Sequence, residues 1–407
     1  MRIVIIGAGP SGMMCAGQCA ESNEVIVLDQ NEKCGKKLYI TGKGRCNVTN
    51  NVIGNEFLEN VVNNNKFLYS SINVFSSQDT IDFFENQNIP LKIERGNRVF
   101  PQSDKASDIT KGLEQFCKKN GVKFLLNEKV INIQKQNNNN FCIKTSKSSI
   151  LCDAIVICCG GVSYPTTGSD GSLYNIIEKL GHTIVKPKPA LCPIILKNKW
   201  VKEVEGLSLK NVEIKAFSNN KLIKSFFGEM LFTQKGISGP IVLSLSSYIN
   251  MIDTLDLVLD FKPALSDEKL SARLERDFEE FKNNEIGTLL KQLLPKNFIP
   301  IFLNCLRIDS HKIVKTLTSK DRQFILKLLK NFPLEFDCLD KIDYAIVTSG
   351  GVSTKEINPK TMQSKIIENL YFAGEVIDVD ALTGGFNIQI ALSTGYCAGI
   401  DLKYKEI

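Results

Sequence analysis

Short apolar runs with many β-branched residues lie near both ends of the chain. Arg2–Ile6 and Glu24–Leu28 flank a run of small residues, Met13–Ala20, that has few helix breakers. Ala154–Ile157 and Asn369–Phe372 repeat the apolar pattern far downstream. Continuous runs of this kind are typical of strands buried on both faces of a parallel sheet. The pattern predicts an α/β fold in which the two ends of the chain form one domain.

The middle of the chain has two different periodicities. Residues 191–261 contain short alternating runs, which predict antiparallel strands, and 265–329 has helical spacing before a further strand at 332–336. The polar tract 137–140 is predicted to be a hairpin tip. We expect a dinucleotide-binding Rossmann-like domain at 1–190 and 343–407, split by an insert. The insert is divided into a β-rich subdomain (191–262 and 333–342) and a helical subdomain (263–332).

Composition and charge narrow the class of protein. The 407 residues are 43% hydrophobic and 23% charged with a net charge of +6, so we expect a soluble globular protein and no nucleic-acid partner. The 13 cysteines include no CxxC pair, which argues against a zinc site or a disulfide framework and favours a cytoplasmic location. Glycines interrupt the apolar N-terminal run, and four glycines with several polar residues make the uncharged stretch 381–400 a poor membrane span. Neither a targeting segment nor a membrane anchor is expected, and the oligomeric state is left open.

A GxGxxG motif lies between the first predicted strand and helix. An acid follows at the end of the second strand, 22 residues after the first glycine, as dinucleotide-binding units require. The first glycine permits a tight turn, the second lets a pyrophosphate approach the backbone, and the third lets helix and strand pack closely. The acid can accept hydrogen bonds from ribose hydroxyls. The predicted cofactor contacts here are Gly7, Gly9, Pro10, Ser11, Gly12, Asp29 and Gln30.

The C-terminal part of the chain favours FAD as the dinucleotide. A short strand ends in a glycine–acid pair and leads through a Thr-Gly-Gly-Phe-Asn turn into a helix of small residues. This arrangement resembles flavoproteins of the two-dinucleotide-binding-domain type. The resemblance implies that the glycine–acid turn binds the ribityl–pyrophosphate region and that the helix N-terminus faces the flavin pyrimidine edge, where it favours the reduced anion. The residues implied are Val130, Gly160, Gly374, Glu375, Asp378, Gly384, Gly385, Phe386 and Asn387.

Five segments resemble one bacterial family, the aminoacetone-oxidase-like or bile-acid-reductase-like NAD(P)/FAD-dependent oxidoreductases. They are Leu38–Asn50 (LYITGKGRCNVTN), Arg98–Ala106, Gly228–Pro240, Thr348–Val352 and Gly374–Asn387. This chain differs from the family at Gln234, where the family usually has histidine. A proton-transfer role of that histidine is therefore not expected in this chain. The basic, glycine-containing loop at 36–50 is predicted to hold FAD phosphates or an acidic substrate. Its candidate cofactor contacts are Lys37, Thr41, Gly44, Arg45, Cys46 and Asn47.

The sequence therefore predicts an FAD-dependent oxidoreductase that acts on a small molecule. Hydride would pass from NAD(P)H or an organic donor, through the flavin, to a small acceptor such as an enone-like double bond. No second GxGxxG is present, so NAD(P)H is expected to act as a transient reductant near the flavin. An amine oxidase that uses oxygen and a non-catalytic FAD-binding redox sensor remain alternatives. His182 and His311 are interpreted as structural, a Cys34–Cys46 pair is disfavoured, and no catalytic residue is assigned.

Overall fold

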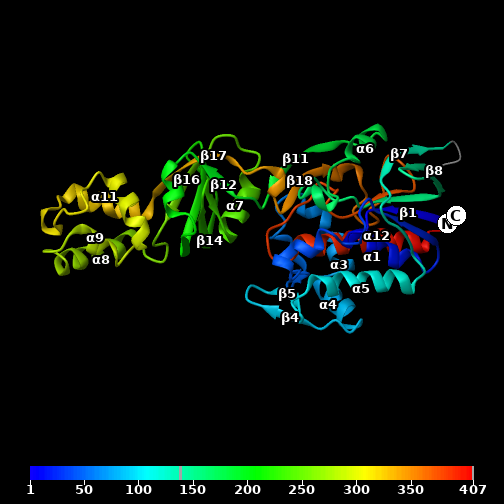
Figure 1. Ribbon diagram of the computed structural model, residues 1–407, viewed down its shortest axis with the longest axis horizontal. Helices are drawn as coiled ribbons and strands as arrows, with labels where there is room; N and C mark the ends of the chain where they lie inside the picture. The colour runs from blue at the N-terminus through cyan, green and yellow to red at the C-terminus, as the bar shows by residue number, and fades with distance from the viewer. Residues whose placement is uncertain (137–139, 406–407) are drawn as a thin grey trace. The chain divides into compact units, whose positions relative to one another are not determined.

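The computed structural model describes residues 1–136 and 140–405. The chain divides into two compact units, Met1–Ala190 with Ile342–Ile407, and Leu191–Lys341 (Figure 1). Each unit has a hydrophobic cluster of its own. We describe the two units separately.

A five-stranded parallel sheet forms the centre of the first unit. Its order is β19-β10-β1-β2-β6, and each neighbouring pair is parallel. The side chains Ile3, Val4 and Ile5 of the central strand are fully buried, as expected for a strand covered on both faces. The strands are β1 (Arg2–Ile6), β2 (Glu24–Leu28), β6 (Lys123–Leu125), β10 (Ala154–Ile157) and β19 (Leu370–Phe372).

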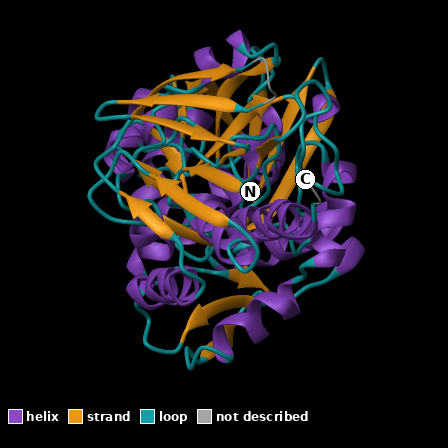
Figure 2. Ribbon diagram, turned by 90° about the vertical axis from the view of Figure 1, so that its right-hand side faces the viewer, coloured by secondary structure: helices purple, strands orange, loops and turns teal. Residues whose placement is uncertain are grey.

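Helices from both ends of the chain pack together on this sheet. A Cβ at Gly395 would lie 2.3 Å from the carbonyl oxygen of Ser11, so the C-terminal helix approaches the first helix through a residue without a side chain. In Figure 2 helices cross the middle of the view, with strands above and below them. The longer helices are α1 (Pro10–Cys19), α4 (Ser77–Glu85), α5 (Ala106–Lys119) and α12 (Phe386–Tyr404), and the shorter ones are α2 (Gly54–Leu58), α3 (Tyr69–Val74) and α6 (Tyr174–Lys179).

Three smaller sheets complete the first unit. β3 (Thr49–Asn50), β5 (Arg98–Pro101) and β4 (Leu91–Glu94) form one antiparallel sheet, and β7 (Val130–Lys135), β8 (Phe141–Thr145) and β9 (Ser149–Cys152) form another. β11 (Ile184–Ala190) pairs with β18 (Val347–Val352). The predicted hairpin tip at 137–140 lies mostly outside the described residues, because 137–139 are not described. Short 3-10 turns are η1 (Leu38–Gly44), η2 (Asn65–Leu68), η3 (Pro165–Thr167), η7 (Ile342–Tyr344) and η8 (Thr354–Glu356).

The second unit contains a closed barrel of the order β12-β15-β14-β13-β16-β17. The strands are β12 (Ile194–Leu196), β13 (Ser208–Ser218), β14 (Lys221–Thr233), β15 (Gly236–Ser238), β16 (Asp256–Asp260) and β17 (Phe332–Leu339). Helices α8 (Asp267–Glu280), α9 (Ile286–Leu290), α10 (Ile299–Leu306) and α11 (Ser319–Lys330) follow β16, with η4 (Lys199–Val204), η5 (Lys296–Phe298) and η6 (Val314–Thr316) as short turns. Barrel and helices contribute to one buried cluster, so the division of the insert into two subdomains stays a prediction.

One helix lies where the sequence predicted only strands. α7 (Pro240–Ile249) begins with proline in its first turn, directly after Gly239. It is apolar around most of its circumference, and Ile241, Val242 and Leu245 are all buried. Such a run cannot be distinguished from a buried strand by periodicity alone. The predicted fold class, a split Rossmann-type domain with an inserted β-rich part, is confirmed.

Candidate functional site

The glycine turn at the start of α1 is shaped by close backbone packing at two of its three glycines. Gly7 has a φ of +111°, and a Cβ there would lie 2.3 Å from the carbonyl oxygen of Cys158. A Cβ at Gly12 would lie 1.9 Å from the carbonyl oxygen of Gly7. A Cβ at Gly9 would meet nothing within 4 Å. The open space therefore lies beside Gly9, where the sequence places the pyrophosphate.

The N-terminus of α1 has no side-chain cap. Gly9 is its N-cap residue, Pro10 follows, and its first turn has no acidic residue. Backbone N–H groups at such an end attract an anion, because they lack intrahelical partners and carry the positive end of the helix dipole. Together with the space beside Gly9, this end of α1 fits a pyrophosphate.

The acid of the motif holds the turn together. One carboxylate oxygen of Asp29 accepts a hydrogen bond from the Ala8 N–H at 2.8 Å, and the other accepts from the backbone and side chain of Asn31 at 2.8 and 2.9 Å. The neighbouring Gln30 side chain donates to the Gly168 carbonyl at 2.9 Å. A carboxylate has about four acceptor positions, so contact of Asp29 with a ribose stays a prediction.

The C-terminal motif lies against this turn. A Cβ at Gly374 would lie 2.5 Å from the Ser11 hydroxyl oxygen, and the Gly374 N–H donates to Thr394 at 2.9 Å. The structure thus brings together segments more than 360 positions apart, at the carboxyl ends of β1 and β19. Ligands of open α/β sheets bind at this edge.

Glu375 is the centre of a polar cluster beside the turn. The Lys37 ammonium lies 2.7 Å from one carboxylate oxygen, and the Thr348 N–H and the Ser163 hydroxyl donate to the other at 2.9 and 3.1 Å. Lys37 also donates to the Ser163 hydroxyl oxygen at 2.6 Å. Burial acts to raise the pKa of Glu375, but the Lys37 charge and these hydrogen bonds outweigh it and hold that pKa below its ordinary value. Ser163 and Thr348 were not predicted as site residues; their positions after Gly160-Gly161 and before Gly350-Gly351 were the available signals.

Arg45, a second predicted cation of the basic loop, is held by carboxylates. Arg45 pairs with Glu94 and, at 2.6 Å, with Asp104, and its guanidinium lies 4.2 Å from the centre of the Phe100 ring. This network connects the Leu38–Asn50 and Arg98–Ala106 segments. Contact of Arg45 with a phosphate stays a prediction, since its charge is already balanced within the protein.

The same loop contains a buried acceptor and a buried thiol. Within the part of the chain that the structure describes, the side-chain oxygen of Asn47 is buried without a hydrogen-bond partner, a cost that a ligand donor would remove. Burial raises the pKa of Cys46 to about 12, so its thiol stays protonated at neutral pH. Cys34 and Cys46 are both free thiols. Thr41 uses its hydroxyl to donate to the Leu38 carbonyl at 2.7 Å.

The beginning of α12 packs against β3. Gly385 has a φ of +98°, and a Cβ there would lie 2.3 Å from the Thr49 carbonyl oxygen. The Asn387 side chain accepts from the Ala381 N–H at 3.0 Å and donates to the Ala381 carbonyl at 2.8 Å, which holds the turn before the helix. The close approach to Thr49 thus requires a glycine at position 385. The flavin contacts of Gly384, Gly385 and Phe386 stay predictions.

Two further acids follow Glu375. Asp380 is fully buried, accepts from the Asn63 amide at 2.5 Å, and has a second carboxylate oxygen with no partner in the described part of the chain. Burial raises its pKa to about 6. Asp378 accepts from the Asn64 amide at 3.0 Å, and burial raises its pKa as well. Asn63 and Asp380 were missed by sequence reasoning, because nothing local marks either as buried.

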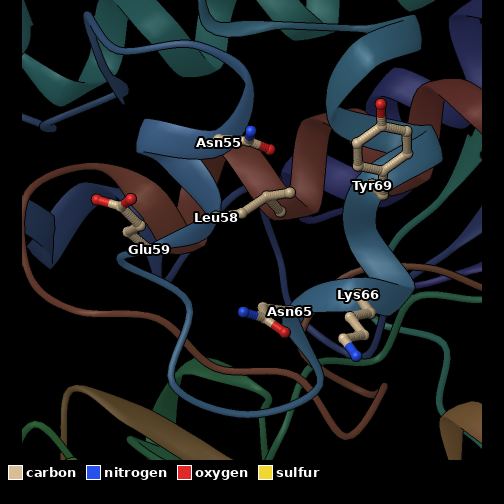
Figure 3. A pocket seen from close by; sticks show the side chains of 6 residues that line it. All are labelled: Asn55, Leu58, Glu59, Asn65, Lys66 and Tyr69. Atoms are coloured by element: carbon tan, nitrogen blue, oxygen red, sulfur yellow. The ribbon is translucent and has the colours of Figure 1, made fainter.

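The remaining candidates lie elsewhere in the first unit or have structural partners. Val130 is buried at the start of β7, and His182 is buried with Nε2 2.8 Å from the Ser364 hydroxyl. A surface pocket of about 600 Å³ (Figure 3) contains no predicted cofactor residue; it is lined by Asn55, Leu58, Glu59, Asn65, Lys66 and Tyr69 from α2, η2 and α3. Among residues 1–136 and 140–405 there is no cluster of three or more metal-binding side chains. In the same residues no helix is both long and apolar enough to cross a bilayer.

Comparison with known proteins defines the class. Residues 1–401 match the model of the HI0933-like protein Rossmann domain, and the chain belongs to this family. The relationship expected from the motifs is confirmed. In fold, the chain is similar to 3-ketosteroid-delta4-(5alpha)-dehydrogenase from Rhodococcus jostii, with a TM-score of 0.54 and 11% identity over 99% of this chain and 96% of that one. This likeness is one of fold.

Two curated relatives are similar over almost their whole length. One is the 3-dehydro-bile acid delta(4,6)-reductase of Clostridium scindens, 29% identical over 98% of both chains. Another is the ribosomal RNA dihydrouridine synthase of Escherichia coli, 29% identical over 98% of this chain and 97% of the relative. This chain is equally similar in sequence to the two relatives, so sequence identity does not favour the activity named for one over that named for the other.

Proposed function

We propose that this protein is an FAD-dependent reductase of carbon–carbon double bonds conjugated to a carbonyl group. The observation that carries the proposal is the open space beside Gly9 at the uncapped N-terminus of α1, next to Gly374 and Glu375. A dinucleotide pyrophosphate fits that space. The orphaned Asn47 oxygen supports a ligand beside the same loop.

The names of the two relatives support the type of reaction. A 3-dehydro bile acid carries a ketone in conjugation with the delta-4,6 bonds. Dihydrouridine is uridine with one ring double bond saturated, and that bond is conjugated to a ring carbonyl. Both reactions add hydride and a proton across an electron-poor double bond. Bound FAD would supply the redox chemistry, taking hydride from NAD(P)H and delivering it to the double-bond carbon distant from the carbonyl.

The protein's own groups would position the cofactor. The α1 N-terminus and the Gly9 backbone would hold the pyrophosphate, and the Asn47 amide would contact the cofactor beside loop 38–47. The Lys37–Glu375 pair would hold the basic loop against the C-terminal motif. Glu375 also contacts Ser163 and Thr348, so it would keep those two segments in place as well. The positive end of α12 would favour negative charge on the reduced flavin.

Anaerobic reduction of the purified protein tests the function. We expect NADH or NADPH to bleach the visible flavin absorbance, and an enone acceptor to restore it. The acceptors are a steroid enone with a side-chain carboxylate, a uridine-containing RNA and, as a small neutral probe, cyclohexenone. Reoxidation only by oxygen after reduction by an amine would identify an amine oxidase instead. A flavin that no donor reduces would indicate a sensor.

A further inference from the structure

The hairpin of β4 and β5 carries an unbalanced positive charge. Its tip is Arg95-Gly96-Asn97, and Arg95 and Arg98 are both exposed. In residues 1–136 and 140–405 neither arginine has a carboxylate within ion-pair distance. The Arg98 Nε donates to the Arg95 carbonyl at 3.0 Å, which orients the guanidinium and leaves its terminal N–H groups for another acceptor.

The other charges of the same hairpin are balanced, including that of Glu94, which directly precedes Arg95 and lies opposite Arg98 in the strand register. Lys92 pairs with Asp104 at 2.8 Å and with Glu94 at 3.6 Å, and Arg45 pairs with the same two carboxylates. Two cations and two anions therefore neutralise one another there. The exposed tip and Lys43 on the neighbouring loop, which is also exposed, carry positive charge that no carboxylate of the described residues pairs with.

The tip is tied to the start of α12 by one side chain. The Asn50 amide donates to the Gly96 carbonyl at 3.1 Å and to the Gly384 carbonyl at 3.0 Å. The Asn51 N–H adds a bond to the Asn97 carbonyl at 2.7 Å. The Asn50 side chain therefore links the arginine tip to the helix N-terminus that is proposed to face the flavin. Two positive features, the arginines and the helix end, converge on one region of the first unit.

We propose that Arg95 and Arg98 bind an anionic group of the acceptor and so hold its double bond beside the flavin. The proposal rests on the reductase function above and specifies its substrate class: an enone that carries a phosphate or a carboxylate. Both groups match the planar fork of a guanidinium, which donates two parallel hydrogen bonds. A phosphate would come from a nucleic-acid backbone, and a carboxylate from a small acid.

The variants Arg95→Gln and Arg98→Gln, singly and together, test the proposal in the holoenzyme. Lys179→Gln is the matched control, because Lys179 is an exposed cation on α6, at the opposite edge of the first unit from β4 and β5 (Figure 1). With whichever anionic acceptor the parent reduces, we expect KM to rise about fivefold for each arginine removed at low salt, with kcat unchanged. The rise should shrink at high salt. KM for cyclohexenone should not change.

Binding without turnover separates this proposal from the reductase assignment. A fluorescent oligouridylate and the carboxylated steroid enone are titrated into the oxidised holoenzyme, whose pyrophosphate site is already filled by FAD. We expect one of the two to bind the parent at low salt and to lose affinity in the double variant but not in Lys179→Gln. Equal binding by parent and double variant, an equal loss in the control, or no binding of either probe would overturn the proposal. Binding that depends on the arginines without any enone reduction would refute the reductase function alone.

Discussion

The glycine turn at 7–12 and the polar cluster around Glu375 are neighbouring halves of the candidate site, yet they are built differently. The turn is shaped mainly by backbone sterics, with gaps and close contacts that depend on missing side chains, and one carboxylate, Asp29, accepts from its Ala8 N–H. The cluster is shaped by charges and hydrogen bonds between side chains, with Lys37 and Glu375 separated by 338 positions. The turn should respond mainly to added volume. The cluster should respond to removed charge and be sensitive to pH.

The largest effect is expected for added volume at Gly12. The Cβ of Gly12→Val would lie 1.9 Å from the Gly7 carbonyl oxygen, which belongs to the backbone of the same tight turn. We expect a loss of more than about 3 kcal/mol in the free energy of unfolding, or no folded protein. Urea unfolding of the FAD-free protein measures it. A variant as stable as the parent would show that the turn is not shaped by this contact.

A smaller loss is expected when the charge of Lys37 is removed. Lys37→Met leaves the largely buried Glu375 carboxylate without its cation, which costs about 3 kcal/mol. The pKa of Glu375 should then rise, since the Lys37 charge no longer opposes the effect of burial, so the variant should recover stability as the pH falls. The double variant Lys37→Met with Glu375→Gln should recover most of the loss at neutral pH. Equal losses in single and double variants would show that the pair contributes no coupling.

Asp380 should give an effect no larger than that of Lys37, and one of opposite sign. Its native pKa of about 6 lies above the unfolded value of 3.8, so the unfolded state binds fewer protons and stability falls as the pH rises from about 4 to 6. Asp380→Asn removes that cost and should stabilise the protein at pH 7 by up to about 3 kcal/mol. The gain should vanish below about pH 4. Urea unfolding of the parent and the variant across this pH range measures the gain. A stability difference that does not change with pH would contradict a raised pKa of the buried Asp380 carboxyl.

The sequence predicted the turn more completely than the cluster. Glycine spacing follows from local geometry, so the positions of the strand, turn and helix could be derived from the consecutive residues 2–20. The partners of Lys37 and Arg45 could not, because each cation meets carboxylates that only the tertiary fold brings near. For the same reason the burial of Asp380 was missed, whereas α7 was missed because periodicity alone does not distinguish its apolar run from a buried strand. Local patterns determine backbone shape, whereas charge pairing depends on long-range contacts.

FAD retention by Gly9→Val tests the central claim most directly. The structure leaves free space where the added side chain would lie, so the FAD-free variant should unfold at nearly the same urea concentration as the FAD-free parent. The parent should be yellow and release FAD on denaturation, while the variant should be colourless and fail to bind added FAD, because valine fills the space of the pyrophosphate. A variant that binds FAD as tightly as the parent would contradict the placement of the cofactor at this turn.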